Sequence, residues 1–189
     1  MLAVILAGGK SQRMGQDKST LPFCGTNLLH YQVVKFSEAG FQVAVSQKET
    51  PGYLTFPDQY HGRGPMAGLH AAFSQTEAAC LFLLAVDLPA ADPALAWAMA
   101  AYLQPEDDVC VLRRQNGQVE PLFAFYRRSC LPAAERLLQA GNGKMRLLLE
   151  QVHTHFLDAN LFPAYNLDQV LYNMNYPADY TASISHSLG

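Results

Sequence analysis

An apolar run over residues 1–5 leads directly into a glycine-rich loop over residues 6–18. The run is typical of a buried strand, and the loop carries three cations, Lys10, Arg13 and Lys18. In an open α/β sheet, ligands bind in the crevice outside the carboxyl ends of the strands. Glycines let the backbone approach a polyphosphate and turn N–H groups toward it, while cations offset its charge. The segment therefore predicts a site for a nucleoside triphosphate.

Two commoner phosphate loops do not fit this segment. A P-loop has a glycine five positions before its Gly-Lys-Ser/Thr, but Val4 stands five positions before Gly9. The dinucleotide fingerprint also fails, because Gly8 and Gly9 are adjacent and the next glycine is Gly15. The remaining alternative is a flexible surface loop, which three glycines and three cations directly after a buried strand make the weaker interpretation.

Composition limits the classes of protein to which the chain can belong. Half of its 189 residues are hydrophobic, which excludes a disordered chain and predicts a single domain over residues 1–189. The net charge of −3 argues against nucleic-acid binding. Runs of about 20 apolar residues, as a membrane span needs, and a basic leader are both missing from the sequence, so a cytoplasmic location is expected. The four cysteines are widely spaced, which predicts buried, reduced thiols and no zinc site.

The hydrophobic pattern alternates between strand and helix along most of the chain. Beyond the first strand, further strands are predicted at residues 41–46, 79–86, 109–112, 122–126 and 152–157. Helices are predicted at residues 27–40, 64–75, 92–103, 131–141, 143–150 and from 176 onward. This alternation predicts an α/β protein with a doubly wound, mostly parallel sheet. Asn116-Gly117 is typical of a tight hairpin, so the strands at 109–112 and 122–126 are expected to form an antiparallel portion of the sheet.

Asp87 directly follows the apolar run over residues 79–86 and precedes Leu88-Pro89. A carboxylate at the carboxyl end of a central strand lies at the same crevice as the first loop. Mg²⁺ prefers one or two carboxylates together with substrate phosphates, so Asp87 suits a metal ligand. The alternative is an aspartate that only forms a turn.

Two further segments carry weaker signals. Gly64-Pro65-Met66-Ala67-Gly68 opens a predicted helix whose free N–H groups and small residues suit a nucleotide, although tight helix packing explains them equally well. The loop before this helix contains His61 and Arg63. These side chains either contact phosphate or have no functional contact. His153 and His155 share strand spacing but have no Cys, Asp or Glu at metal-ligand spacing, so they are interpreted as surface histidines.

The motif Leu-Ala-Gly-Gly-x-x-x-Arg-Met-Gly followed by Asp-Lys resembles the signature loop of the sugar-phosphate and cofactor nucleotidyltransferases. The order of motifs from Leu6 to Pro177 most resembles the molybdenum cofactor guanylyltransferases. This resemblance implies a Rossmann-like α/β fold and an enzyme that uses Mg²⁺. It also implies transfer of GMP from GTP to the terminal phosphate of molybdopterin, with release of pyrophosphate.

The resemblance also implies roles for individual residues. The catalytic residues would be Arg13, Lys18 and Asp87, with Asp87 as the metal ligand. The nucleotide would contact Leu6, Ala7, Gly8, Gly9, Lys18, Asp58, Gly64 and Asp87. Asp58 would read guanine, because a carboxylate can accept from both its N1–H and its 2-amino group. Many members carry an asparagine after the second strand where this chain has Val45-Ser46-Gln47, so we assign that role to no residue.

Asn173 and Asn175 resemble the Asn-x-Asn-x-Pro motif that would bind the acceptor. Placed in a strand they would share a face, although two turn-forming asparagines before a proline are an equal alternative. The implied partners are GTP and molybdopterin, and in addition molybdoenzymes or their chaperones, for a protein that acts as a monomer. A molybdopterin cytidylyltransferase, a sugar-phosphate nucleotidyltransferase and a non-catalytic nucleotide-binding protein remain alternatives.

Overall fold

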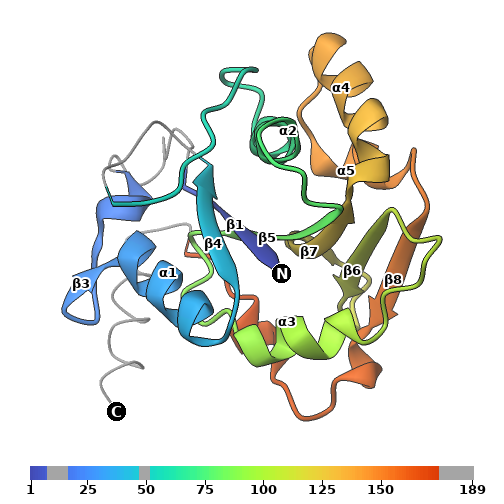
Figure 1. Cartoon of the computed structure of the whole chain (residues 1–189). Helices are drawn as coiled ribbons and strands as arrows, with labels where there is room; N and C mark the ends of the chain where they lie inside the picture. The colour runs from blue at the N-terminus through green and yellow to red at the C-terminus, as the bar shows by residue number, and fades with distance from the viewer. Residues whose placement is uncertain (8–16, 47–51, 175–189) are drawn as a thin grey trace.

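The computed structural model describes residues 1–7, 17–46 and 52–174, and its centre is a six-stranded sheet (Figure 1). The strands of this sheet are β1 Leu2–Leu6, β4 Gln42–Ser46, β5 Cys80–Ala85, β6 Val109–Arg113, β7 Val119–Arg127 and β8 Thr154–Asp158. Their order across the sheet is β4-β1-β5-β7-β6-β8. Only β7 runs against its neighbours; the pairs β4–β1, β1–β5 and β6–β8 are parallel. The predicted α/β class and the mostly parallel sheet are therefore confirmed.

Helices cover both faces of this sheet (Figure 1). On one face lie α1 Leu28–Glu38 and α3 Pro93–Ala100, and on the other α2 Pro65–Ser74, α4 Leu131–Gln139 and α5 Met145–Leu149. Each face has its own hydrophobic core, and side chains of β1 alternate between the two cores. All five residues of β1 are buried, as expected of a central parallel strand covered on both sides. None of the helices in the described ranges is long and apolar enough to cross a membrane.

Local sequence explains where several elements begin and end. The Asn27 side chain accepts a hydrogen bond from the His30 amide at 2.8 Å and so begins α1. Asp92 begins α3 in the same way, accepting from the Ala94 amide at 2.8 Å. At the β6–β7 turn Gly117 has φ +82°, a conformation that favours glycine. The sequence analysis did not predict the small hairpin of β2 Pro22–Phe23 and β3 Thr26–Asn27, nor the short helix α6 Leu167–Val170.

The cysteine prediction is partly wrong. Cys110 and Cys130 are buried, but Cys80 is only half-buried and Cys24 is exposed, with φ +46° in the β2–β3 turn. All four are free thiols, as expected.

Candidate active site

The carboxyl ends of β1, β4 and β5 lie side by side at one edge of the sheet. The Ala7 amide donates to the Ser46 carbonyl at 3.3 Å, and the Val86 amide donates to the Leu6 carbonyl at 3.1 Å. Leu6 and Ala7, two of the residues assigned to the nucleotide, are thus at the base of this edge and buried. Asp87 follows one residue after Val86, so it sits at the rim where a ligand would enter.

Lys18 and Asp87 form an ion pair across this crevice. The Lys18 Nζ lies 2.6 Å from Asp87 Oδ2, and the two side chains are 13% and 21% exposed. Asp17 positions the lysine, because its carboxylate accepts from the Ser19 amide at 3.0 Å and from the Ser19 hydroxyl at 2.8 Å. Two residues that the sequence placed in one site are therefore in direct contact. Their charges offset each other while both stay within reach of solvent.

The donor set around Asp87 fits a hard divalent cation. A magnesium ion takes few protein carboxylates and completes its shell with water and phosphate oxygens. A second carboxylate, Glu120 at the start of β7, is close enough for the charge of Asp87 to raise its pKa, although burial is the larger cause. Arg114 partly opposes that rise, with its Nη2 atom 3.6 Å from Glu120 Oε2. The sequence analysis assigned no role to Arg114 or Glu120.

Asp58 lies at the end of β4, where the Ser46 hydroxyl donates to its Oδ1 atom at 2.9 Å. Helix α2 packs tightly against this pair: a Cβ added at Gly68 would stand 2.4 Å from Ser46 Oγ. Gly64, with φ +71°, begins the helix without any side-chain cap. The glycines of this segment thus serve close packing and the turn into α2, and they leave the first N–H groups of α2 without a side-chain cap.

The last described segment of the chain also reaches the crevice. The Met174 amide donates to the Asp87 carbonyl at 2.9 Å. Its neighbour Asn173 donates a side-chain hydrogen bond to Glu120, which lowers the pKa of that carboxyl against the dominant effect of burial. Arg114 holds the segment from the other side, donating to the Leu171 carbonyl and pairing with Asp168 at 3.3 Å. Asn173 lies in irregular chain rather than in a strand, so the strand argument for the two asparagines does not apply.

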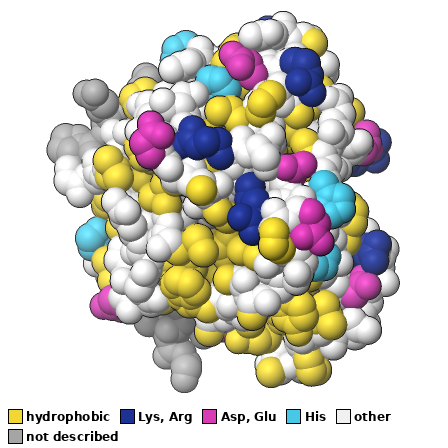
Figure 2. Space-filling model, turned by 45° about the vertical axis from the view of Figure 1, so that its right-hand side comes forward, with side chains coloured by type: hydrophobic (Ala, Val, Ile, Leu, Met, Phe, Trp, Pro, Cys, Tyr) yellow, Lys and Arg dark blue, Asp and Glu magenta, His cyan; other side chains and the backbone are white. Residues whose placement is uncertain are grey.

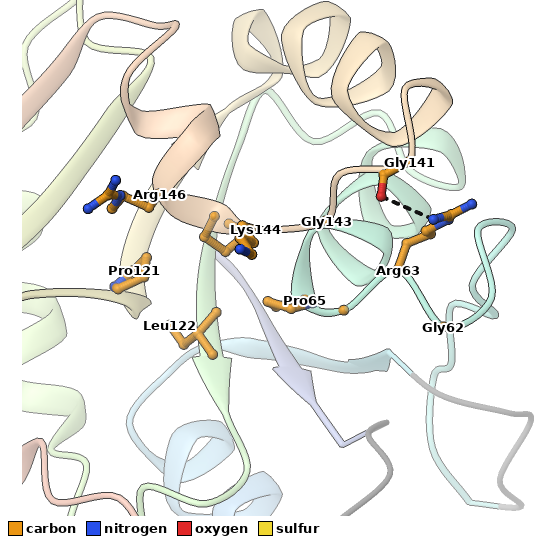
Figure 3. A pocket seen from close by; sticks show the side chains of 11 residues that line it. Gly62, Arg63, Pro65, Pro121, Leu122, Gly141, Gly143, Lys144 and Arg146 are labelled. Carbon is orange, nitrogen blue, oxygen red and sulfur yellow. Dashed lines mark hydrogen bonds between the residues drawn. The ribbon is translucent and has the colours of Figure 1, made fainter.

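Two neighbouring pockets share part of their lining, and Asn173 of this segment lines the larger one. One of about 460 Å³ is lined by residues around Arg63, Leu122 and Lys144 (Figure 3), and the other, of about 840 Å³, by residues around Arg114, Glu120 and Asn173. Pro121 and Arg146 line both pockets.

In the wall of the smaller pocket, the backbone at Gly143 lies close to the backbone at Arg63. A Cβ added at Gly143 would stand 1.4 Å from the Arg63 carbonyl oxygen, so only glycine fits there. Arg63 also donates to the Gly141 carbonyl at 3.0 Å, the dashed line in Figure 3. Its guanidinium thus has a structural partner, while His61 is exposed. On the face drawn in Figure 2, basic and acidic side chains are interspersed rather than gathered into a basic stripe.

Several predicted site residues lie outside the described ranges. They are Gly8, Gly9, Lys10, Arg13 and Asn175, together with the helix predicted from residue 176. Their roles stay predictions.

The expectation for the histidines is wrong for His155. Its Nδ1 atom lies 3.0 Å from Asp107 Oδ2, and Asp107, Cys110 and His155 form a group whose ligand atoms all lie within 4.8 Å of one another. Chain spacing gave no sign of this group, because the strand register rather than a local motif brings its members together.

Comparisons with known proteins agree on one family. A family model described as "MobA-like NTP transferase domain" matches residues 3–155. A protein of Carboxydothermus hydrogenoformans named "Probable molybdenum cofactor guanylyltransferase" is 32% identical over 186 residues, covering 95% of this chain and 93% of the relative. A Geobacillus protein of the same name is 27% identical over 190 residues, covering 95% and 96%. The crystal structure of molybdopterin-guanine dinucleotide biosynthesis protein A from Archaeoglobus fulgidus has the same fold, with a TM-score of 0.83 at 22% identity and coverage of 100% and 99%.

Proposed function

The chain belongs to the MobA-like NTP transferase family, and from that premise we propose that it transfers GMP from GTP to the terminal phosphate of molybdopterin. The observation that carries this proposal is the Lys18–Asp87 pair, 2.6 Å apart at the edge where three parallel strands end. The pair offers both a cation for phosphate and a carboxylate for a metal ion. The names of the relatives supply the base and the acceptor.

In the proposed reaction an oxygen of the acceptor phosphate attacks the α-phosphorus of GTP. The new P–O bond forms as the bond from the α-phosphorus to the bridging oxygen breaks, and pyrophosphate leaves with that oxygen. The attacking oxygen is already anionic, so the reaction needs no general base. Lys18 stabilises the charge that develops on the phosphates, and Arg13 is proposed to do the same.

Asp87 is proposed to hold Mg²⁺, with Glu120 close beside it. When bound, the ion would offset phosphate charge and favour departure of pyrophosphate. Lys18 donates to Asp87, and in the proposed reaction its ammonium group would contact the phosphates while Asp87 holds the ion. Removal of divalent cations is therefore expected to abolish turnover, and addition of Mg²⁺ to restore it.

Asp58 is proposed to select guanine. The Ser46 hydroxyl donates to Oδ1 of Asp58 and so orients the carboxylate at the end of β4. A carboxylate held in this way has acceptor capacity left for the N1–H and the 2-amino group of guanine. The Leu6-Ala7-Gly8-Gly9 segment and Gly64 would then contact the rest of the nucleotide through backbone groups.

The acceptor is proposed to bind in the larger pocket, which Asn173 lines, and in the smaller pocket next to it, with Asn175 contributing from the same segment as Asn173. Arg114, Lys144 and Arg146 line these pockets and carry the positive charge that a phosphorylated acceptor needs. We further propose that the protein works as a cytoplasmic monomer and passes its product to molybdoenzymes or their chaperones.

A pyrophosphate-release assay tests the proposal. The protein is incubated with Mg²⁺, molybdopterin and each of the four nucleoside triphosphates in turn, and pyrophosphate is measured over time. Release that needs both GTP and molybdopterin is the expected result. A preference for CTP would point to cytidylyl transfer instead, and GTP binding without any release would point to a non-catalytic nucleotide-binding protein.

A further inference from the structure

A second group of ligand-type side chains lies at the opposite edge of the sheet from the crevice. Strand β7 is antiparallel to both β5 and β6, so β6 runs in the same direction as β5 and β1. Cys110 is near the amino end of β6 and His155 near the amino end of β8, whereas Asp87 follows the carboxyl end of β5. Figure 1 shows β6 and β8 side by side at the end of the sheet far from β4. This group is therefore separate from the candidate active site.

The fold brings the three side chains together through strand register. Cys110 and His155 are direct partners in the parallel β6–β8 pair. Two residues further along, Leu112 and Leu157 are also partners, and both belong to the same core as Cys110, so the side chains share a face of the sheet. Asp107 precedes β6 in a turn that its own side chain closes, by accepting from the Gln104 amide at 2.8 Å.

The side-chain carboxyl group of Asp107 is buried inside the protein. The residue is 2% exposed, and a buried carboxylate is costly unless a positive charge compensates it. Among the described residues, its ion pairs are with two histidines alone, His155 at 3.0 Å and His153 at 3.7 Å. The nearby Arg127 donates instead to the Gln104 carbonyl at 2.9 Å. A cation bound beside these histidines would supply the compensating positive charge.

We propose that Asp107, Cys110 and His155 bind a divalent transition-metal ion of the zinc type, and that this ion fastens β8 to β6. A thiolate, an imidazole and a carboxylate form a ligand set suited to zinc, and their ligand atoms already lie within 4.8 Å of one another. His153 or water completes a tetrahedral shell. His155 is partly exposed and marks the route by which the ion enters.

Binding requires that the Cys110 thiol lose its proton. Burial and the charge of Asp107 raise the pKa of the Cys110 thiol to about 12, so an ion that binds here has to displace a thiol proton. The ion would take the place of that proton, which passes to solvent, and the metal–sulfur bond would form with no oxidation or reduction.

Titration of the chelator-treated full chain with Co²⁺ tests the proposal without using the transferase reaction. We expect a thiolate-to-cobalt charge-transfer band together with the visible bands of tetrahedral Co²⁺, and Zn²⁺ should displace both. Zn²⁺ at a hundredfold excess over its Kd should raise the Tm by about 5 °C or more. Mg²⁺ gives no such bands, so the result is independent of the crevice.

Variants assign the ligands. Cys110→Ser should remove the charge-transfer band, and His155→Gln should weaken binding more than ~100-fold, beyond what loss of an indirect contact costs. Cys130→Ser is the matched control, since Cys130 is also buried but packs in the other core. Circular dichroism reports whether each variant folds. If Cys110→Ser does not fold, the result for His155→Gln decides. A wild type without the bands, or bands that persist without Cys110 and His155, would overturn the proposal and leave a protonated histidine as the partner of Asp107.

Discussion

Charged side chains gather at both ends of the parallel strands, here called the carboxyl edge and the amino edge of the sheet. The two groups differ in how far solvent reaches them. At the carboxyl edge, Lys18 and Asp87 pair at 2.6 Å and remain 13% and 21% exposed. At the amino edge, Asp107 is 2% exposed and faces histidines. An ion pair that solvent can reach can exchange partners with an incoming substrate, whereas a sealed carboxylate contributes to the fold through fixed contacts. Lys18 and Asp87 are thus placed to change partners, whereas Asp107 is placed to stabilise the fold.

The largest effect is expected from Asp87→Asn. Loss of the proposed metal ligand should lower kcat on the order of 10³-fold, while the protein stays folded because the pair with Lys18 is partly exposed. Steady-state pyrophosphate release and thermal unfolding measure both quantities. Asp92→Asn is the matched control, since asparagine also begins helices well. A folded Asp87→Asn protein with turnover close to that of Asp92→Asn would remove Asp87 from the mechanism.

Lys18→Gln is expected to lower kcat/KM by about 10²-fold, because a fixed cation near developing charge acts mainly in the transition state. Lys18 and Asp87 should act on one metal–triphosphate unit, so the double variant should be little worse than Asp87→Asn alone. A double-mutant cycle with Lys18→Arg as the charge-retaining control measures this coupling. Fully additive losses would show that the two residues serve separate steps.

At the amino edge, Asp107→Asn should lower the free energy of unfolding by ~1–3 kcal/mol, because it disturbs buried hydrogen bonds to the Gln104 amide and His155. Urea unfolding in the presence of a chelator measures this loss without any metal contribution. Asp158→Asn provides the comparison, since its pair with Arg113 is exposed to solvent and is expected to contribute much less. Equal losses in the two variants would contradict the contrast drawn between sealed and exposed carboxylates.

Asp58→Ala should weaken GTP binding by about tenfold, equivalent to ~1.4 kcal/mol, and ATP binding by much less. Adenine has no N1–H, so it cannot use the carboxylate as guanine does. Titration calorimetry with both nucleotides on both proteins measures the gap, and Ser46→Ala should produce a smaller change in the same direction. If both nucleotides weakened equally, Asp58 would serve the ribose, the metal or the fold.

The smallest effect concerns pH. Burial raises the pKa of Glu120, so the folded state holds this proton more tightly than the unfolded state. The stability associated with Glu120 is therefore full below the unfolded pKa and falls as pH rises through the folded pKa. Glu120→Gln should gain stability relative to wild type over that rise. A stability difference between Glu120→Gln and the wild type that does not change with pH would contradict the assignment.

Local signals predicted most of the fold. Asn27, Pro65 and Asp92 begin helices through contacts within a few residues, and Asn116-Gly117 closes the hairpin that makes β7 antiparallel. The two-residue strands of the β2–β3 hairpin are too short to give a period, so they were missed.

The same difference between local signals and long-range contacts explains which residues of the candidate site were predicted. Lys18 and Asp87 were placed together because each follows a strand end, and strand ends of a parallel sheet share an edge. Arg114 and Glu120 were assigned no role, because their importance depends on the return of residues 168–173 to the crevice. The Asp107–Cys110–His155 group depends on a register between strands 45 residues apart, which no spacing along the chain records.

The hydrogen bond from the Met174 amide to the Asp87 carbonyl also bears on how the protein is made. The strands β4, β1 and β5 are complete once residue 85 has been synthesised. Their crevice lacks its final wall until the ribosome has added nearly ninety more residues and this amide can reach the turn. During synthesis the strands β4, β1 and β5 can therefore pair before Asn173 and Met174, which reach the Asp87 turn, have been made. On the proposed roles of Asp87 and Asn173, activity is expected only after residue 174 has been made.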